Sequence, residues 1–283
     1  MGSVVPLKKE INNSYFELKN MLEDRLNNVN QLIKHKLASE INLIHKMIDY
    51  HIKSGGKRIR ALLTLASAKL CGYKDGSRDV NLAACIELIH NATLLHDDVI
   101  DNGNLRRGIK TSNVIWGNQS SILVGDYLFS RCFEMMVEDG SQEILKLLSS
   151  TSSKIAQGEV LQLEHKGEVD ILEEIYFNII NLKTASLFSA ATRVGACITS
   201  KNKKEKDSLE SYGRNLGLAF QIADDALDYY STNTAFGKEI GKDFFEGKVT
   251  LPIIFLYQKS NTSEKIFLEK IFKKKVRSKL EYD

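Results

Sequence analysis

Three carboxylates lie within five residues in the sequence DDVID at positions 97–101, directly after a long apolar run. If this segment is helical, Asp97 and Asp101 stand one turn apart on the same face, where like charges repel. A cation between them would relieve the repulsion, and Mg²⁺ accepts one or two carboxylates together with substrate phosphates. The motif therefore predicts metal-assisted chemistry on a phosphorylated substrate. A solvated acidic helix face would have the same pattern.

A second copy of the motif, DDALD at positions 224–228, also ends an apolar run. Chance recurrence in two matching contexts is hard to explain as surface acidity alone. If both helices line one cavity, the two carboxylate groups can face each other across it. The pair therefore favours a shared metal and phosphate site over two unrelated surface patches.

Basic residues accompany these motifs. Arg106 and Arg107 follow the first one, and guanidinium groups suit bidentate contacts to phosphate. The sequence GGKRIR at 55–60 precedes an apolar helical pattern, so its backbone could approach an anion at a helix N-terminus. Lys57 and Arg60, three residues apart, would lie on one side. The alternative is a glycine turn with exposed basic residues, because this is not the phosphate loop GxxxxGK[ST].

His90 precedes Asp97 by seven residues, which places it on nearly the same helix face, about 11 Å away. A histidine at such a position is either a ligand of the acidic site or a core residue with its own partners. His96 points elsewhere by the same geometry, and we assign it no role.

Two further segments place polar groups near the second motif. Lys183 and Thr184 are flanked by apolar or small residues, so the lysine either enters a cavity or lies on the surface. Gln221 precedes Asp228 by seven residues and shares its face. A polar loop after the motif carries three lysines close behind the carboxylates, at positions 238, 242 and 248.

The composition excludes several classes of protein. A net charge of +3 over 283 residues, with the basic residues in local clusters, does not indicate nucleic-acid binding. Residues 1–10 lack the apolar segment of a signal peptide, and no charge-free apolar stretch is long enough to span a bilayer. The four cysteines are scattered, which favours buried reduced thiols and a cytoplasmic protein (Cys71, Cys85, Cys132 and Cys197).

The chain contains two prolines, and its apolar residues recur mostly at intervals of three and four, so we expect an all-α, single-domain helical bundle. Residues 1–10 and about 273–283 are expected to be poorly ordered. The basic segment 265–279 is either a frayed terminus or a peripheral contact with an anionic membrane or a partner. The expected helices cover residues 11–37, a stretch after the N-cap Ser39 that reaches Ile52, 61–70, a run from about Leu82 that leads into the first acidic motif, about 121–137, 142–164, 171–199, 209–230 and 249–258, with a charged turn at 201–207.

From about residue 40 to Pro252 the chain resembles the trans-isoprenyl diphosphate synthases, or polyprenyl synthetases. The sequences GGKRIR, LLHDDVID, LRRG, KT and FQIADDALDY occur in the order of that family. The resemblance implies helices around a deep central cavity, a homodimer, and Mg²⁺ held between the two aspartate-rich motifs. A class I terpene cyclase is disfavoured because the second motif is intact, and a phosphohydrolase using His96 is disfavoured by the helix geometry.

The resemblance also implies roles for individual residues, transferred position by position. Four of the implied residues act in the chemical step: Asp97, Asp101, Lys183 and Asp224. Isopentenyl diphosphate would be bound by Lys57, Arg60, His90 and Arg107, and the allylic diphosphate by Arg106, Lys183, Thr184, Gln221 and Lys238. The principal Mg²⁺ ligands would be Asp97, Asp101 and Asp224, supported by Asp98, Asp225 and Asp228.

The residues before the first motif bear on product length. Ala92 and Thr93 are small, whereas short-chain members of the family carry bulky aromatic residues here that close the cavity. We therefore expect a long octaprenyl-to-decaprenyl product, made from farnesyl diphosphate and destined for a quinone side chain. The alternatives are a shorter, geranylgeranyl-type product and a non-catalytic subunit of a heteromeric synthase. Two features depart from the family: Ala61 replaces a proline, and the KKKVRSKLEYD segment is unfamiliar.

Overall fold

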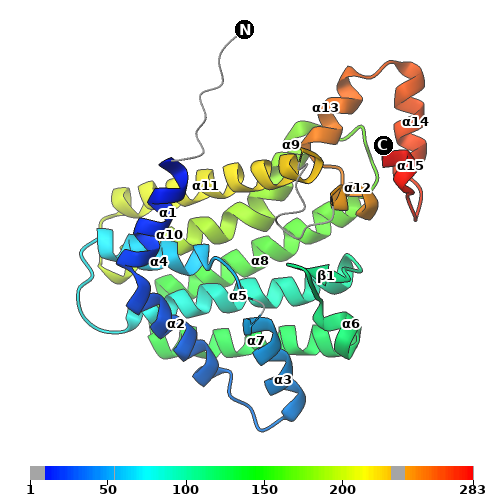
Figure 1. The fold of residues 1–283 in the computed structure, drawn as a ribbon. Coiled ribbons are helices and arrows are strands. Elements are labelled where there is room, and N and C mark those ends of the chain that lie inside the picture. Colours follow the sequence, from blue (N-terminus) through cyan, green and yellow to red (C-terminus); the bar gives the residue numbers. More distant parts are fainter. Residues whose placement is uncertain (1–9, 54, 231–239, 283) are drawn as a thin grey trace.

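The structure is a computed structural model that describes residues 10–53, 55–230 and 240–282. Helices make up nearly all of it, as the sequence predicts (Figure 1). The helices of the first half are α1 (Glu10–Met21), α2 (Glu23–Lys36), α3 (Asn42–Lys53), α4 (Ile59–Leu70), α5 (Arg78–Ile100), α6 (Ser112–Trp116) and α7 (Asn118–Asp139). The second half contains α8 (Gln142–Glu164), α9 (Glu173–Ile180), the π-helix η1 (Asn181–Ala185), α10 (Ser186–Ile198), α11 (Lys203–Tyr230), α12 (Lys242–Glu246), α13 (Leu251–Lys259), α14 (Thr262–Phe272) and α15 (Lys279–Tyr282).

Helix α5 runs through the middle of the bundle and packs against α2, α4, α7 and α10. Its residues from Leu82 to Ile89 are all buried. A helix that is apolar on every side is stable only when other helices surround it, which explains its central place. The long apolar run before the first acidic motif is therefore the core that carries this motif.

Several elements differ from the sequence prediction. The first helix breaks at Leu22, whose buried side chain joins the core. The charged segment 201–207 is helical from Lys203 onward. A short antiparallel hairpin, not predicted, pairs β1 (Leu105–Arg106) with β2 (Ile109–Lys110). The expected helix 171–199 is divided by η1, a π-helix of the kind that often marks functional positions.

Glycines allow α11 to approach its neighbours closely. A Cβ atom on Gly217 would lie 2.6 Å from the Cα of Ala185, and one on Gly213 would collide with Thr192 and Phe188. The absence of side chains at these two glycines therefore permits a close helix contact. The contact brings the second half of α11 directly against η1 and α10.

The C-terminal helices form a separate apolar cluster around Phe244, Ile253, Ile271 and Phe272. Pro252 lies in the first turn of α13. Residues 273–282, expected to be poorly ordered, are described as a turn followed by α15. Cys85, Cys132 and Cys197 are buried, Cys71 is half-buried, and all four are free thiols, in agreement with the prediction.

No helix in the described ranges combines the length and the apolar character needed to cross a membrane.

Candidate active site

The first acidic motif occupies the C-terminal end of α5. Asp97 and Asp98 lie in its last turn, and Asp101 is the capping residue. A helix C-terminus carries partial negative charge, so three carboxylates there are unfavourable unless cations lie nearby. The surrounding residues supply such cations from three other parts of the chain.

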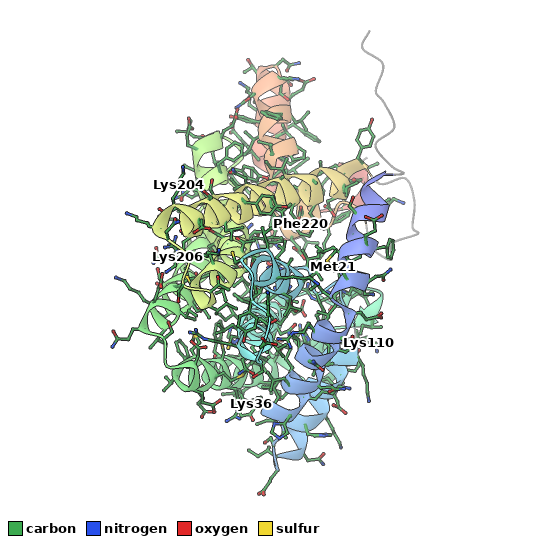
Figure 2. All side chains as sticks on the ribbon, turned by 90° about the vertical axis from the view of Figure 1, so that its left-hand side faces the viewer. Met21, Lys36, Lys110, Lys204, Lys206 and Phe220 are labelled. Carbon is green, nitrogen blue, oxygen red and sulfur yellow. The ribbon has the colours of Figure 1, made fainter. Side chains whose placement is uncertain are left out.

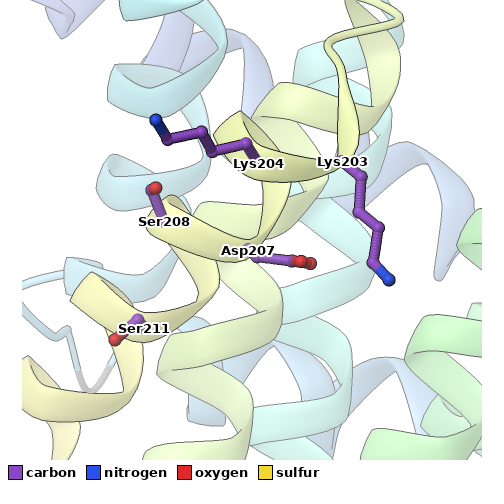
Figure 3. A pocket seen from close by; sticks show the side chains of 5 residues that line it. All are labelled: Lys203, Lys204, Asp207, Ser208 and Ser211. Atoms are coloured by element: carbon purple, nitrogen blue, oxygen red, sulfur yellow. The ribbon is translucent and has the colours of Figure 1, made fainter.

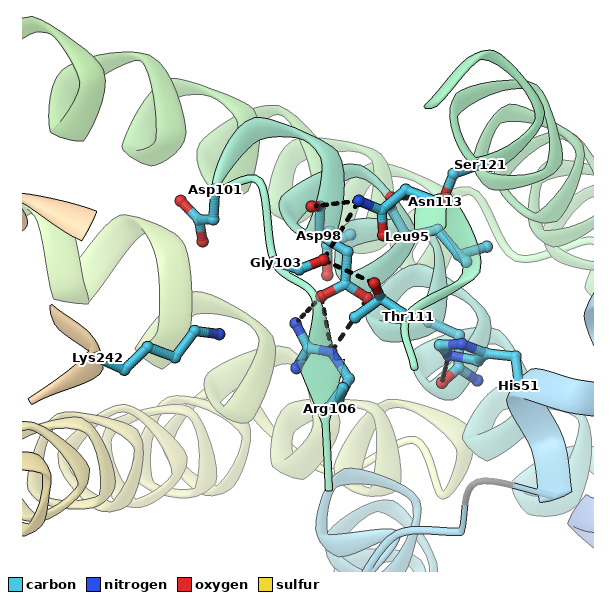
Figure 4. Close-up of polar contacts among 12 residues, drawn as sticks. His51, Leu95, Asp98, Asp101, Gly103, Arg106, Thr111, Asn113, Ser121 and Lys242 are labelled. Carbon is cyan, nitrogen blue, oxygen red and sulfur yellow. Dashed lines mark hydrogen bonds and ion pairs between the residues drawn. The ribbon is translucent and has the colours of Figure 1, made fainter. Parts of the chain in front are cut away.

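Asp98 is held by Arg106. The Arg106 guanidinium donates through Nε at 3.0 Å and through Nη2 at 2.8 Å to the Asp98 carboxylate, which is only 3% exposed (Figure 4). The hairpin positions Arg106 for this pair, since the Thr111 hydroxyl donates to the Gly103 carbonyl at 2.6 Å. Asp98, predicted as a supporting metal ligand, and Arg106, predicted to bind the allylic diphosphate, are thus paired with each other.

Asp101 is paired with Lys248, whose ammonium lies 2.6 Å from Asp101 Oδ2 and 2.8 Å from Glu246 Oε2. Burial raises the pKa of Asp101, but the attraction of Lys248 outweighs burial and leaves the pKa below its usual value. Lys242 extends from α12 into the space beside Asp101 and adds to this effect (Figure 4). Asp101 is therefore held in its charged form.

Asp97 lies among charges of both signs. Burial raises its pKa to about 7, opposed by Lys183 and reinforced by Glu159 and Asp101. A carboxyl group with this pKa is half-protonated near neutral pH, and a bound divalent cation would favour its charged form. A bound metal ion would therefore change the protonation of Asp97 more than that of Asp101, which is already charged.

The second acidic motif ends α11. Asp225 is 4% exposed and accepts hydrogen bonds from Tyr176 Oη and from Gln221 Nε2, both at 2.7 Å. Thr184 donates to Gln221 Oε1 at 2.7 Å, so Thr184, Gln221 and Asp225 form one chain. Burial raises the pKa of Asp225 to about 6, partly offset by these two hydrogen bonds. Asp224 and Asp228 are half-buried.

Lys183 projects from η1 toward α8. Its ammonium lies 2.6 Å from Glu159 Oε1 and 2.9 Å from Gln162 Oε1. Gly158 permits this approach, because a Cβ atom there would lie 2.8 Å from the Lys183 backbone nitrogen. Lys183 is thus half-buried and directed at polar groups, which differs from both a free surface lysine and a lysine in an apolar cavity.

The two acidic motifs face each other across Lys248. Besides pairing with Asp101, Lys248 lowers the pKa of Asp225. The backbone amide of Asp243, in the same loop, donates to Asp228 Oδ2 at 2.9 Å. Helices α5 and α11 end on the same side of the bundle, next to α12 (Figure 1). The convergence expected from the repeated motif is therefore present.

A basic group lies between α4, α5 and the hairpin. Arg60 Nη1 is 3.0 Å from His90 Nε2, and its guanidinium stacks 4.6 Å above the Phe188 ring. Burial lowers the pKa of Arg60 to about 10, and burial together with Arg60 lowers that of His90. Arg107 donates to the Gly55 carbonyl and packs on Gly56, while Lys57 is exposed. The sequence-predicted residues Arg60, His90 and Arg107 are thus neighbours.

Two side chains that the sequence did not single out support this group. Glu87 is 2% exposed; it binds Arg58 at 3.0 Å and accepts from the Ala61 backbone amide at 3.2 Å. His51 lies 3.3 Å from Asn91 Oδ1, and burial lowers its pKa to about 4. Glu87 could have been suspected, because a charged residue inside a fully apolar helical run needs a partner.

Other predicted or missed residues are placed as follows. Ala92 is fully buried on α5, and Thr93 is half-buried with its hydroxyl donating to the His90 carbonyl at 2.8 Å. Lys238 falls outside the described residues. Besides Glu87 and His51, the sequence did not assign a role to six residues of the acidic site: Glu159, Gln162, Tyr176, Asp243, Glu246 and Lys248. Of these six, Lys248 alone could have been suspected, because it follows closely behind the second motif.

A surface hollow of about 720 Å³ lies at the other end of α11, lined by Lys203, Lys204, Asp207, Ser208 and Ser211 (Figure 3). Lys204 and Lys206 mark this end in the turned view, with Phe220 further along the helix (Figure 2). At 1.5 Å per residue, Ser208 is roughly 24 Å from Asp224 along the helix axis. The hollow is therefore not part of the acidic site.

The oxygen-rich set around Asp97 and Asp101 fits a hard divalent cation such as Mg²⁺. The Lys248 ammonium already lies against Asp101, and the charge of Lys183 lowers the pKa of Asp97, so the site accommodates positive charge. Within the described residues, no three His, Cys, Asp or Glu side chains are gathered closely enough to form a metal cage. This is compatible with Mg²⁺ bound by few carboxylates together with substrate phosphates.

The chain is also similar in sequence and structure to known prenyl diphosphate synthases. Octaprenyl diphosphate synthase of Escherichia coli (strain K12) is 44% identical over 226 residues, which are 80% of this chain and 70% of that protein. A decaprenyl diphosphate synthase from Rhodobacter capsulatus has a similar structure, with a TM-score of 0.89 and 42% identity over 95% of this chain and 82% of that one. A polyprenyl synthase from Caulobacter crescentus, complexed with calcium and isoprenyl diphosphate, gives a TM-score of 0.90 at 42% identity, covering 95% and 81%.

These structures share the isoprenoid synthase fold with this chain. The family model described as polyprenyl synthetase matches residues 41–282. The chain belongs to the polyprenyl synthetase family and is a trans-prenyltransferase.

Proposed function

We propose that the enzyme adds isopentenyl diphosphate repeatedly, in trans, to an allylic diphosphate and forms an octaprenyl-to-decaprenyl diphosphate. The observation that carries the site assignment is the meeting of both acidic motifs across Lys248, with Arg60, His90 and Arg107 gathered beside them. One diphosphate would be bound by metal and lysines at the acidic motifs. A second would be bound by the arginines of the basic group. The two substrates would then lie next to each other.

The acidic side binds and ionises the allylic diphosphate. Mg²⁺ bound by Asp97, Asp101 and Asp224, with support from Asp225 and Asp228, would neutralise charge that develops on the leaving diphosphate. Lys183, whose ammonium now contacts Glu159 and Gln162, is within the same group of charges as Asp97 and would donate to the leaving oxygens. Thr184 and Gln221 hold Asp225 in place. The carboxylates act as ligands and not as general acids.

The basic side orients isopentenyl diphosphate. Arg60 and Arg107 would form charge-assisted hydrogen bonds to its phosphates, joined by Lys57 and by His90. The low pKa of His90 keeps its ring neutral near pH 7, so it can donate one hydrogen bond without adding charge. The double bond of this substrate then attacks the allylic cation, and the proton it loses passes to the released diphosphate.

Product length is proposed to depend on Ala92 and Thr93. The Thr93 hydroxyl donates to the His90 carbonyl, so the rest of the Thr93 side chain is a single small methyl group. Small side chains in this part of α5 leave room for a growing chain. The relatives that match include octaprenyl and geranylgeranyl diphosphate synthases, so a shorter product is the alternative. A long product would suit a quinone side chain.

The test is to incubate the purified protein with farnesyl diphosphate, labelled isopentenyl diphosphate and Mg²⁺, and to size the products. Eight to ten isoprene units are expected. The variants Thr93→Phe and Ala92→Phe should shorten the product at comparable turnover. Four units from the unaltered protein would establish the alternative, and unchanged length in both variants would remove these residues from the proposal.

We further propose a homodimer. Helix α7 exposes Leu123, Phe133 and Val137, which are 61%, 42% and 65% exposed. Apolar side chains repeated along one helix favour burial against a second copy. Sedimentation should give twice the chain mass, and Leu123→Glu should shift it toward the monomer. The exposed Leu70 on α4 provides a control, because Leu70→Glu should leave the mass unchanged.

A further inference from the structure

The loop formed by residues 241–248, here called the α12 loop, touches both acidic motifs. The amide of Gly241 donates to the Asp228 carbonyl and that of Asp243 to Asp228 Oδ2, each at 2.9 Å. At the other end of the loop, Lys248 reaches Asp101 at 2.6 Å. The position of this loop therefore fixes where Lys248 lies relative to the carboxylates.

The loop has little to hold it by itself. Its helix α12 spans five residues, too few to be stable in isolation. Gly241 and Gly247 flank the helix, both with positive φ angles of 75° and 74°. Glycine has wide backbone freedom at such positions, so contacts from elsewhere must keep the loop in one conformation.

Two residues of the C-terminal segment 273–282, Arg277 and Tyr282, supply those contacts. The Arg277 guanidinium packs on Gly247 where a side chain would otherwise stand, and it donates to the Phe245 carbonyl at 3.3 Å and to the Phe272 carbonyl. Arg277 is 8% exposed. A buried guanidinium with these partners is expensive to desolvate unless its hydrogen bonds are kept, so its position is well defined.

Tyr282 packs against the other glycine in the same way. Its ring occupies the place of a Gly241 side chain and stacks on Phe245 with centroids 5.7 Å apart. It also stacks on Tyr229 at 6.2 Å, the residue that follows Asp228. The Tyr282 ring therefore joins the α12 loop to the end of α11.

We propose that Arg277 and Tyr282 are positioning residues for the allylic diphosphate site. They fix both ends of the α12 loop, so that Lys248 is held within reach of Asp101 and of the diphosphate. This inference rests on the proposed assignment of Asp101 and the second motif to that site. In this proposal both residues act through the α12 loop and Lys248. Loosening the loop weakens binding of the allylic substrate, because the loop must be ordered again each time that substrate binds.

The test compares Arg277→Met and Tyr282→Ala with the unaltered enzyme in steady-state kinetics. Each variant should raise the KM for the allylic diphosphate by about five-fold or more and keep the KM for isopentenyl diphosphate within about two-fold. The second value is expected to hold because Arg60, His90 and Arg107 lie on other elements. The control is Leu280→Ala in the same segment, where the side chain is 88% exposed, and it should change neither KM.

Three results would overturn the proposal. They are an unchanged allylic KM, an equal rise for both substrates, and loss of the folded state, which would show that these residues support the whole bundle. Asp101→Asn, measured in parallel, separates this inference from the proposed function. If Asp101→Asn is inactive and the two C-terminal variants behave like the unaltered enzyme, only the positioning role fails. If Asp101→Asn is fully active, the site assignment fails first.

Discussion

Two charged regions of this enzyme differ in how their side chains are paired: the acidic region around the two aspartate motifs, and the basic region around Arg60, His90 and Arg107. In the acidic region each of the central carboxylates has a cation close by: Arg106 lies on Asp98 and Lys248 on Asp101. In the basic region Arg60 faces His90 and the Phe188 ring, and Arg106 and Arg107 further lower the pKa of His90. The carboxylates Asp98 and Asp101 are thus each paired with a cation, whereas the arginines of the basic region share one buried carboxylate, Glu87.

Under the proposed function, each region lacks the charge that its own ligand would bring. Burial raises the pKa of Asp97 and lowers that of Arg60, so both regions resist their own charge. A metal ion would favour the charged form of Asp97, whereas a diphosphate would offset the positive charge of Arg60, which stays protonated near pH 7. In the proposed function, the lysines of the acidic region would then be free to contact the phosphates that bind with the metal.

Asp101→Asn should have the largest effect. The substitution keeps the size of the side chain but removes the charge that Lys248 and a metal ion share, so kcat should fall by roughly 1,000-fold. Product formation with farnesyl diphosphate at saturating Mg²⁺ measures it. Asp75→Asn, an exposed carboxylate on the surface, should keep full activity. A loss of less than about ten-fold in Asp101→Asn would contradict the importance of this carboxylate.

Arg60→Met should have the next largest effect and should act on the other substrate. Loss of a charge-assisted contact to phosphate should raise the KM for isopentenyl diphosphate by about 30-fold and leave the KM for the allylic substrate within about two-fold. Arg60→Lys tests whether charge or the planar fork matters, and we expect it to recover only part of the loss. The control Lys69→Met, exposed on the same helix, should be silent. An equal rise in the KM of both substrates would show that the acidic and basic regions do not bind separate substrates.

The two regions should also differ in the sign of their pH dependence. Asp97 has a folded-state pKa of about 7 against 3.8 in the unfolded chain, so its protonated form stabilises the fold and this stability is lost as pH rises from about 4 to 7. The pKa of His90 is lowered, so its neutral form is favoured and stability is lost as pH falls below about 6.5.

Melting curves without metal can separate these effects. Relative to the unaltered protein, Asp97→Asn should gain several degrees more at pH 7.5 than at pH 4.5. His90→Gln should show the reverse, with its relative gain larger at pH 5 than at pH 8. Each variant serves as the control for the other. Parallel trends in the two variants would show that the contrast between the regions is mistaken.

Much of the acidic region could be predicted from the sequence, because spacing along one helix fixes which side chains share a face. The repeat of DDxxD and the seven-residue step to Gln221 needed only helix geometry, whereas the same step to His90 did not reveal that His90 faces Arg60. Long-range partners were beyond that reasoning. Glu159 reaches Lys183 from α8, and its position depends on the close packing at Gly158, which no local pattern reveals.

Some predictions failed at points where tertiary contacts override local preference. The hairpin was not predicted, because two-residue strands carry almost no pattern, yet it places Arg106 on Asp98. The π-helix was missed since its residues have ordinary helix propensity and only the extra residue in the turn shifts Lys183 and Thr184. The fold class followed from periodicity, and the partners of the charged residues did not.

The smallest predicted effect concerns Ala61, where the family usually has proline. The Ala61 amide has no helical acceptor at this early position of α4, and it donates instead to Glu87 at 3.2 Å. Ala61→Pro removes that bond and crowds Glu87, which should cost about 1 kcal/mol, or about 2 °C in Tm, with the KM for isopentenyl diphosphate changed less than about two-fold. Glu87→Gln keeps an acceptor for the amide but leaves Arg58 without its charged partner, so it should lower Tm further. If Ala61→Pro instead raised this KM strongly, the amide would be part of the binding site, and the basic region would depend on backbone donors as well as on its arginines.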